Sequence, residues 1–245
     1  MFFRRKAILL IHGFVGGIYD FGALGNELEL YKNFDVYSFT LPGHEKSVVK
    51  DVKYQDWIKA AEEQMRFLIN HKYKEIYVVG HSMGGVIAAY IASSYPQVKK
   101  LVLAAPAFRY FYFKEGKINL KGINQTIKNV PGLMKEEGRG KVNERITKTP
   151  LPTVLEFTKL VDRYQMCLDR VNCPTLIIHG MSDTVVPKES TDLVHNNIKS
   201  KTNILINIKD VAHDCFTGKK KEDVINETIS FLRKQHKNTN MTIEM

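Results

Sequence analysis

The sequence predicts an α/β protein whose mostly parallel sheet is covered by helices on both faces. Short runs rich in Val, Ile and Leu recur along the 245 residues, and most are followed by turn residues and then a helical pattern. Continuous apolar strands that alternate with helices are typical of parallel sheets buried on both sides. The six predicted strands span residues 7–11, 36–39, 76–79, 100–103, 175–178 and 204–208.

Three helices can be recognised between and after these strands. Residues 54–70 carry apolar side chains at helical spacing, which predicts one buried and one solvated face. Residues 83–94, MGGVIAAYIASS, are small and apolar nearly all round, so we expect this helix to be buried close against the sheet. Residues 222–235 place apolar side chains along one stripe. The polar, aperiodic residues 237–245 that follow are expected to form a disordered tail.

The alternation of strands and helices stops between residues 107 and 171. An aromatic cluster at 108–113 opens this segment, a stretch rich in Gly and Lys follows, and a clear amphipathic helix over about 154–171 closes it. A segment of this length without strand signals, set between two core strands, predicts an inserted helical cap over one end of the sheet. The core then consists of residues 1–106 and 172–236.

The composition is that of an ordinary globular protein, with 25% charged residues. No apolar run approaches the roughly 18 residues of a membrane-spanning helix. The basic start imitates a signal peptide, but its apolar stretch at 7–11 is short and runs into His12-Gly13 without a cleavage site. The three cysteines lack CxxC spacing, which indicates neither a disulfide framework nor a zinc site. We therefore expect a cytoplasmic protein without a metal or cofactor.

The net charge of +10 raises the question of an anionic partner. The lysines are spread along the whole chain, and acidic residues directly follow the one tight cluster, Lys219-Lys220-Lys221. We therefore expect no nucleic-acid partner, while weak association with anionic surfaces stays open.

A serine lies between glycines where the strand at 76–79 meets the helix at 83–94. Gly80-His81-Ser82-Met83-Gly84 matches G-x-S-x-G, in which a strand turns abruptly into a helix and holds the serine at the apex. The flanking glycines are needed because side chains there would collide with the neighbouring strand and helix. The alternative is a small residue in a tight turn, which would need no acid and base partners elsewhere in the chain.

A serine hydroxyl is a weak nucleophile near neutral pH and needs a base that a carboxylate orients. His213 follows the last predicted core strand, on a loop that can reach back over the carboxyl edge of the sheet. Asp183 follows the penultimate strand, with Asp210 and Asp214 as its rivals. His179, at the end of a strand, is interpreted as structural.

Acyl transfer also needs hydrogen-bond donors for the oxyanion. We expect the backbone N–H of Met83, at the start of a helix, to be one donor. The second is expected from Phe14, in the turn after the first strand. The alternative for His12-Gly13 is a plain turn that ends the strand.

Five motifs in order make the chain resemble an α/β-hydrolase: HGF at 12–14, LPGH at 41–44, GHSMGG at 80–85, HGMSDTVVP at 179–187 and AH at 212–213. Within that superfamily it is similar to small bacterial carboxylesterases and monoacylglycerol lipase-like enzymes. The resemblance implies Ser82 as nucleophile, Asp183 and His213 as its partners, Phe14 and Met83 as oxyanion donors, and a helical lid. Many relatives read G-H-G-x-S where residues 43–47 read GHEKS, a departure that bears on substrate detail.

These residues predict a metal-free serine esterase that cleaves short- to medium-chain acyl esters or monoacylglycerols through an acyl-enzyme on Ser82. A thioesterase, an acyltransferase or a carbon–carbon bond hydrolase would use the same triad, and a ligand-binding protein of this fold is a non-enzymatic alternative. Aromatic residues of the insert would line an acyl pocket or pack the cap onto the core: Phe108, Tyr110, Phe111, Tyr112 and Phe113. The acyl chain, the alcohol and the oligomeric state are not set by the sequence.

Overall fold

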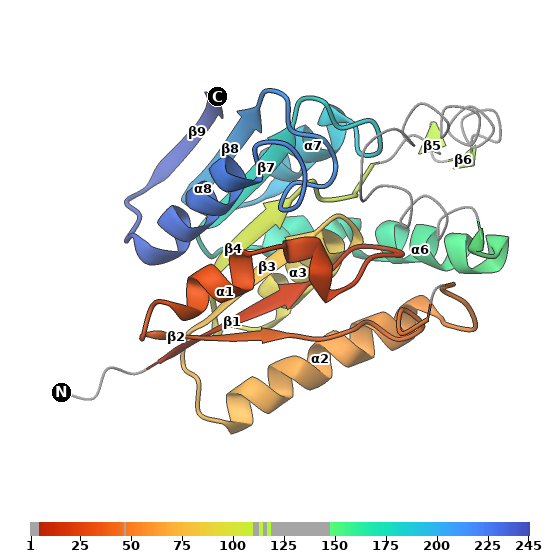
Figure 1. Ribbon diagram of the computed structural model, residues 1–245, viewed down its shortest axis with the longest axis horizontal. Helices are drawn as coiled ribbons and strands as arrows, with labels where there is room; N and C mark the ends of the chain where they lie inside the picture. The colour runs from red at the N-terminus through yellow and green to blue at the C-terminus, as the bar shows by residue number, and fades with distance from the viewer. Residues whose placement is uncertain (1–4, 47, 110–112, 115–116, 119–147) are drawn as a thin grey trace.

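A parallel sheet of seven strands forms the centre of the computed structural model, which describes residues 5–46, 48–109, 113–114, 117–118 and 148–245 (Figure 1). The sheet order is β2-β1-β3-β4-β7-β8-β9, and a separate antiparallel pair is formed by β5 and β6. The predicted α/β fold is thereby confirmed. The strands are β1 Lys6–Ile11, β2 Phe34–Ser38, β3 Ile76–His81, β4 Val98–Ala104, β5 Phe113–Lys114, β6 Lys117–Ile118, β7 Thr175–Gly180, β8 Thr202–Ile208 and β9 Thr239–Glu244.

Helices cover both faces of this sheet, because side chains alternate along each buried strand. In β1, Leu9 and Ile11 join the core under one helical layer, whereas Ile8 and Leu10 join the core under the other. The first layer contains α2 Tyr54–Asn70, α3 Met83–Ser94, α6 Leu151–Tyr164 and α7 Lys188–Asn197. The second contains α1 Leu24–Glu29 and α8 Lys221–Arg233 (Figure 1). Two 3-10 helices complete the described elements, Ile18–Phe21 and Gln165–Arg170.

The strand register brings four connecting loops to one edge of the sheet. Ile11 pairs with Gly80, and Gly180 pairs with Ile208. Because every pairing in the large sheet is parallel, the carboxyl ends of β1, β3, β7 and β8 lie at the same edge. The loops that follow these strands carry the predicted site residues.

The helix α3 approaches the sheet unusually closely. A Cβ atom on Gly84 would lie 2.0 Å from the Ile11 carbonyl oxygen, and one on Gly80 would lie 2.4 Å from the Gly84 carbonyl oxygen. Only glycine leaves room for backbone at these separations. The glycine at position 84 therefore allows the first turn of α3, which directly follows Ser82, to lie against the end of β1.

The expectation of a disordered tail over residues 237–245 is wrong. Residues 239–244 form β9, which pairs in parallel with β8 along six residue pairs. The Met245 N–H donates to the Asn207 carbonyl, and the Lys209 N–H donates to the Met245 carbonyl. Sequence periodicity missed this strand because it is an edge strand with mostly exposed side chains, so backbone hydrogen bonds rather than apolar burial hold it in place.

The cap predicted for residues 107–171 is described only in part. Its closing helix is α6, which packs against α2 and α3. Residues 110–112, 115–116 and 119–147 lie outside the described residues, so the cap as a unit stays a prediction.

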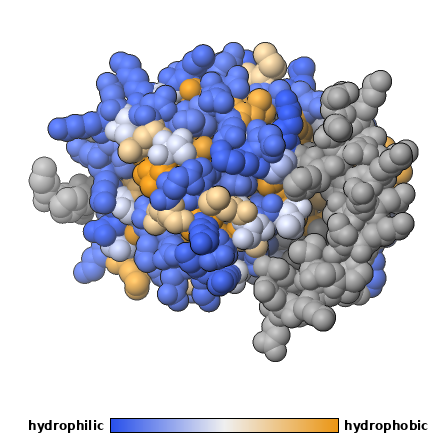
Figure 2. Space-filling model, turned by 90° about the horizontal axis from the view of Figure 1, so that it is seen from above, coloured by the Kyte–Doolittle hydropathy of each residue, from blue (hydrophilic) through white to orange (hydrophobic). Residues whose placement is uncertain are grey.

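Within the described ranges, no helix is both long enough and apolar enough to cross a membrane. The described surface seen in Figure 2 is mostly hydrophilic, with small hydrophobic patches.

Candidate active site

Ser82 stands between β3 and α3 in a strained backbone conformation. Its φ is 54° and its ψ is −120°, in the left-handed half of the map that non-glycine residues seldom occupy. The Ser82 N–H donates to the Ala104 carbonyl at 3.0 Å, and the Ser82 carbonyl accepts from Gly85 at 2.9 Å and Ala107 at 3.1 Å. Strain of this kind persists only where the surroundings over-determine it. Here the end of β4 and the first turn of α3 do so.

The structure brings together the three side chains predicted to act as a triad. The distance between Ser82 Oγ and His213 Nε2 is 3.0 Å, and that between His213 Nδ1 and Asp183 Oδ2 is 2.8 Å. Because a carboxylate only accepts, the imidazole proton lies on Nδ1, which leaves the Nε2 lone pair free to accept the Ser82 O–H. The hydroxyl, the imidazole and the carboxylate thus form one continuous hydrogen-bonded chain, which is the arrangement that a serine nucleophile would require.

The side chain of Asp183 is fully buried, yet its surroundings favour the ionised form. Burial by itself raises the pKa of the Asp183 carboxyl, but the interaction with His213 and two backbone hydrogen bonds lower that pKa below its usual value. Those bonds reach Oδ1 from the N–H groups of Val185 at 2.7 Å and Val186 at 2.9 Å. The rival Asp210 instead lies 4.0 Å from Lys219 Nζ. The carboxylate that contacts His213 is therefore that of Asp183.

The two predicted oxyanion donors flank Ser82. Met83 is the first residue of α3, and Phe14 lies in the turn after β1. A Cβ atom on Gly13 would be 3.1 Å from Ser82 Cβ, so this turn runs directly beside Ser82. Among the described residues, neither the Phe14 nor the Met83 backbone N–H has a hydrogen-bond acceptor. Their role as oxyanion donors stays a prediction.

Two buried histidines, whose motifs were recognised in the sequence without a role, hold the turn that contains Phe14. His44 Nε2 accepts the Val15 N–H at 3.2 Å, and His12 Nε2 accepts the Leu41 N–H at 2.9 Å. Val15 has a φ of 55°, which is rare for a β-branched residue. The histidines therefore join the turn after β1 to the loop after β2 and support the strained backbone next to Phe14.

Comparison with known proteins places the chain in a family. The family model for serine aminopeptidase, S33, matches residues 4–137 and 140–220. The chain belongs to this family. It is 26% identical over 238 residues to a thermostable monoacylglycerol lipase of Bacillus sp. strain H-257, covering 93% of this chain and 90% of that protein. It is 24% identical to a carboxylesterase of Bacillus subtilis strain 168, covering 94% and 93%.

Solved structures support the same fold for this S33-family chain. A structure reported for LipS and LipT, two metagenome-derived lipolytic enzymes, superposes with a TM-score of 0.75 at 22% identity and covers 94% of each chain. Together with the family match, this likeness confirms the α/β-hydrolase fold that the five sequence motifs indicate.

The aromatic residues predicted for an acyl pocket are only partly within the described residues. Phe108 is 1% exposed and belongs to the core cluster that includes Met83 and Phe157, so the structure shows it packing in the core. Tyr110, Phe111 and Tyr112 lie outside the described residues. A different aromatic contact was not anticipated: the Phe14 ring stacks on that of Phe157 in α6, with 5.2 Å between centroids.

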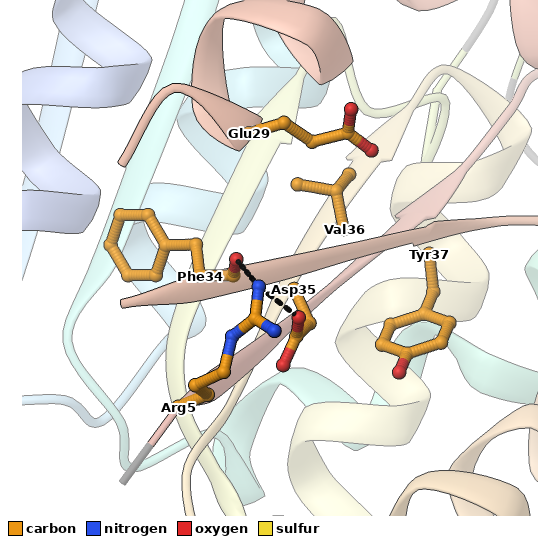
Figure 3. Close-up of a pocket in the computed structure, with 6 residues that line it drawn as sticks. All are labelled: Arg5, Glu29, Phe34, Asp35, Val36 and Tyr37. Carbon is orange, nitrogen blue, oxygen red and sulfur yellow. Dashed lines mark hydrogen bonds and ion pairs between the residues drawn. The ribbon is translucent and has the colours of Figure 1, made fainter. Parts of the chain in front are cut away.

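A hollow of about 340 Å³ lies elsewhere, at the edge strand β2 (Figure 3). Across it, Arg5 Nη2 contacts Asp35 Oδ1 at 2.5 Å and the Phe34 carbonyl at 3.2 Å. The ion pair between Arg5 and Asp35 lies at β2, away from the loops that surround Ser82. Across the described part of the chain, no group of three or more His, Cys, Asp or Glu side chains is arranged to hold a metal ion.

Proposed function

We propose that the protein is a serine hydrolase that cleaves carboxylic esters, either short- to medium-chain acyl esters or monoacylglycerols, through an acyl-enzyme on Ser82. The observation that carries the proposal is the continuous hydrogen-bonded arrangement of Ser82, His213 and Asp183 at a strained turn. The relatives named as a monoacylglycerol lipase and a carboxylesterase support an ester as the substrate.

The proposed reaction begins when Ser82 Oγ attacks the ester carbonyl and His213 Nε2 takes its proton. Asp183 holds the imidazole in the required tautomer and stabilises the imidazolium that forms. The backbone N–H groups of Met83 and Phe14 donate to the oxyanion of the tetrahedral intermediate. The imidazolium then protonates the departing alcohol, and the same base activates the water that releases the acid.

The test compares the unmodified protein with Ser82→Ala on p-nitrophenyl esters of graded chain length. We expect hydrolysis by the unmodified protein and a loss of about 10⁴-fold or more in kcat for Ser82→Ala, because the residues of a triad act as a unit. Ser94→Ala, at the exposed end of α3, is the matched control and should retain full activity. Undiminished turnover by a folded Ser82→Ala variant would refute the proposal.

An extended substrate panel separates ester hydrolysis from thioester hydrolysis, acyl transfer and amide hydrolysis, which the same triad could also catalyse. Acyl thioesters, acyl-acceptor alcohols and an aminoacyl p-nitroanilide are added to the ester series, and the highest kcat/KM defines the reaction class. Preference for a thioester, transfer or amide substrate over every ester would overturn the ester assignment. Absence of fluorophosphonate labelling at Ser82, together with no turnover of any substrate, would instead indicate a ligand-binding protein of this fold, because labelling requires an activated hydroxyl.

A further inference from the structure

A second buried Asp–His pair, Asp20 and His81, lies beside the triad and takes no part in the mechanism above. His81 Nε2–H donates to the backbone carbonyl of His213 at 2.8 Å. His81 Nδ1 lies 3.6 Å from Asp20 Oδ2, an ion-pair separation slightly longer than a hydrogen bond. The side chains of His81 and Asp20 are 8% and 10% exposed. Through His81, the pair therefore contacts the backbone of His213, the proposed base.

Asp20 also contacts the turn that carries the proposed oxyanion donor. Its Oδ2 accepts the Gly13 N–H at 3.1 Å, and its Oδ1 accepts the Gly17 N–H at 3.2 Å. Gly13 directly precedes Phe14 and lies against Ser82. A single carboxylate thus fixes the start and the end of the turn between β1 and the 3-10 helix Ile18–Phe21.

The surroundings favour the charged form of both partners. Burial lowers the pKa of His81, but the Asp20 carboxylate, the His213 carbonyl and the charge of Asp183 raise it above its usual value. Burial raises the pKa of Asp20, but His81 and the Gly13 N–H bring it below its usual value. The buried His81 Nδ1 has no hydrogen-bond acceptor within normal distance. If Nδ1 carries a proton, that proton is attracted by the Asp20 carboxylate. If Nδ1 carries a lone pair, the carboxylate repels it.

We propose that Asp20 and His81 form a buried imidazolium–carboxylate pair that positions both the loop of the base and the oxyanion turn around Ser82. This inference rests on the proposed function of Ser82 and His213. The pair joins the loop after β1 to the loop after β8 through the last residue of β3, so it sets the distance between His213 and Phe14. Asp20 and His81 are positioning residues, since neither contacts the reacting hydroxyl.

The first arm of the test is kinetic. For Asp20→Asn we expect kcat on the best ester to fall about ten- to hundred-fold with little change in KM, because small misplacement of catalytic groups is costly in the transition state. His81→Gln keeps an N–H donor for the His213 carbonyl and should retain more activity than His81→Leu, which has none. Asp192→Asn, which removes an exposed charge paired with Lys188, is the matched control and should behave as the unmodified protein.

The second arm does not depend on activity. Nitrogen NMR of the histidine side chains should show His81 still protonated above pH 6.5, the usual histidine pKa being about 6.5. His179, whose pKa burial lowers, serves as the neutral internal reference. Other ionisable side chains near the pair are His12, Asp183 and His213, whose ring lies 5.0 Å from that of His81 between centroids. In Asp20→Asn the His81 pKa should fall.

The outcomes separate this inference from the proposed function. If the unmodified protein neither hydrolyses any substrate nor is labelled at Ser82, the proposed function fails. If it is active but Asp20→Asn and His81→Leu match it in kcat and in fluorophosphonate labelling rate, the positioning role fails. A His81 side chain found neutral at pH 6 in the unmodified protein overturns the ion pair, even should Asp20→Asn not fold.

Discussion

At the scale of single residues, the candidate site stores backbone strain at its centre. Ser82 and Val15 both have positive φ, and Val15 directly follows Phe14 in the turn after β1. Each such residue costs on the order of 1–3 kcal/mol, which the surrounding hydrogen bonds must offset. The Ala104 carbonyl does so for Ser82 and the His44 ring does so for Val15. A rigid geometry at the site is thus maintained at the expense of stability.

This strain predicts that Ser82→Gly is more stable than Ser82→Ala by about 1 kcal/mol in the free energy of unfolding. Glycine adopts a φ of 54° without steric cost, whereas alanine keeps the Cβ atom. Both variants lack the hydroxyl, so each controls for the other. Urea denaturation followed by circular dichroism measures the difference, and equal midpoints would show that the turn is not strained.

Residue type and position were enough to propose Asp183 and His213 from the sequence, because each follows a predicted strand at the carboxyl edge, but they left Asp210 and Asp214 as rivals of Asp183. The same reasoning did not reach Asp20. That residue lies in a 3-10 helix of four residues, which leaves no periodic signal, and its partner His81 is far along the chain. A pair of this kind is visible only once the turn after β1 is placed against β3.

At the scale of elements, the contact between α3 and β1 decides where Ser82 lies. Apolar spacing predicts α2, the small and apolar composition of residues 83–94 predicts α3, and both helices have the predicted bounds, residues 54–70 and 83–94. The short helices α1 and α7 were not predicted, since α1 spans only six residues and α7 is largely polar. Their sequences carry too few apolar positions to show a helical period.

Two glycine variants test the close approach of α3. Gly84→Ala should destabilise the fold by about 3 kcal/mol and reduce ester hydrolysis, because its Cβ atom would meet the Ile11 carbonyl at 2.0 Å. Gly25→Ala in α1 is the matched control, since its Cβ atom would meet only Leu10 Cδ1 at 3.9 Å. Helix propensity predicts a gain of up to about 1 kcal/mol there. Thermal denaturation of both proteins gives the comparison, which a tolerated Gly84→Ala would contradict.

At the scale of the whole molecule, one sheet separates two apolar cores and ends in the edge strands β2 and β9. The strand β9 extends the sheet beyond β8, whose following loop carries His213. Residues 239–244 therefore have a structural role, as the edge strand next to β8, that their polar sequence does not indicate. The sheet edge is completed by backbone pairing, and the side chains of β9 add little to either core.

Removal of residues 237–245 should lower the free energy of unfolding by several kcal/mol, at about 1 kcal/mol for each net hydrogen bond lost from β8. Ester hydrolysis at low temperature should remain, because Ser82, Asp183 and His213 belong to other loops. Met241→Thr changes a 44% exposed side chain and keeps the backbone pairing, so its Tm should be unchanged. A truncated protein with an unaltered Tm would indicate a tail that does not pair.

The sequence by itself determined the parallel sheet, the serine turn and the loops that carry Asp183 and His213. Each of these features is a local pattern: a run of apolar residues, a helix of small residues, or a polar residue directly after a strand. Local patterns are visible in the sequence alone. Only the tertiary structure decided that Asp183 contacts His213, that Asp20 faces His81 and that residues 239–244 extend the sheet. These contacts join segments that are distant in sequence. The order and register of the strands bring those segments together, and no local sequence pattern encodes strand order or register.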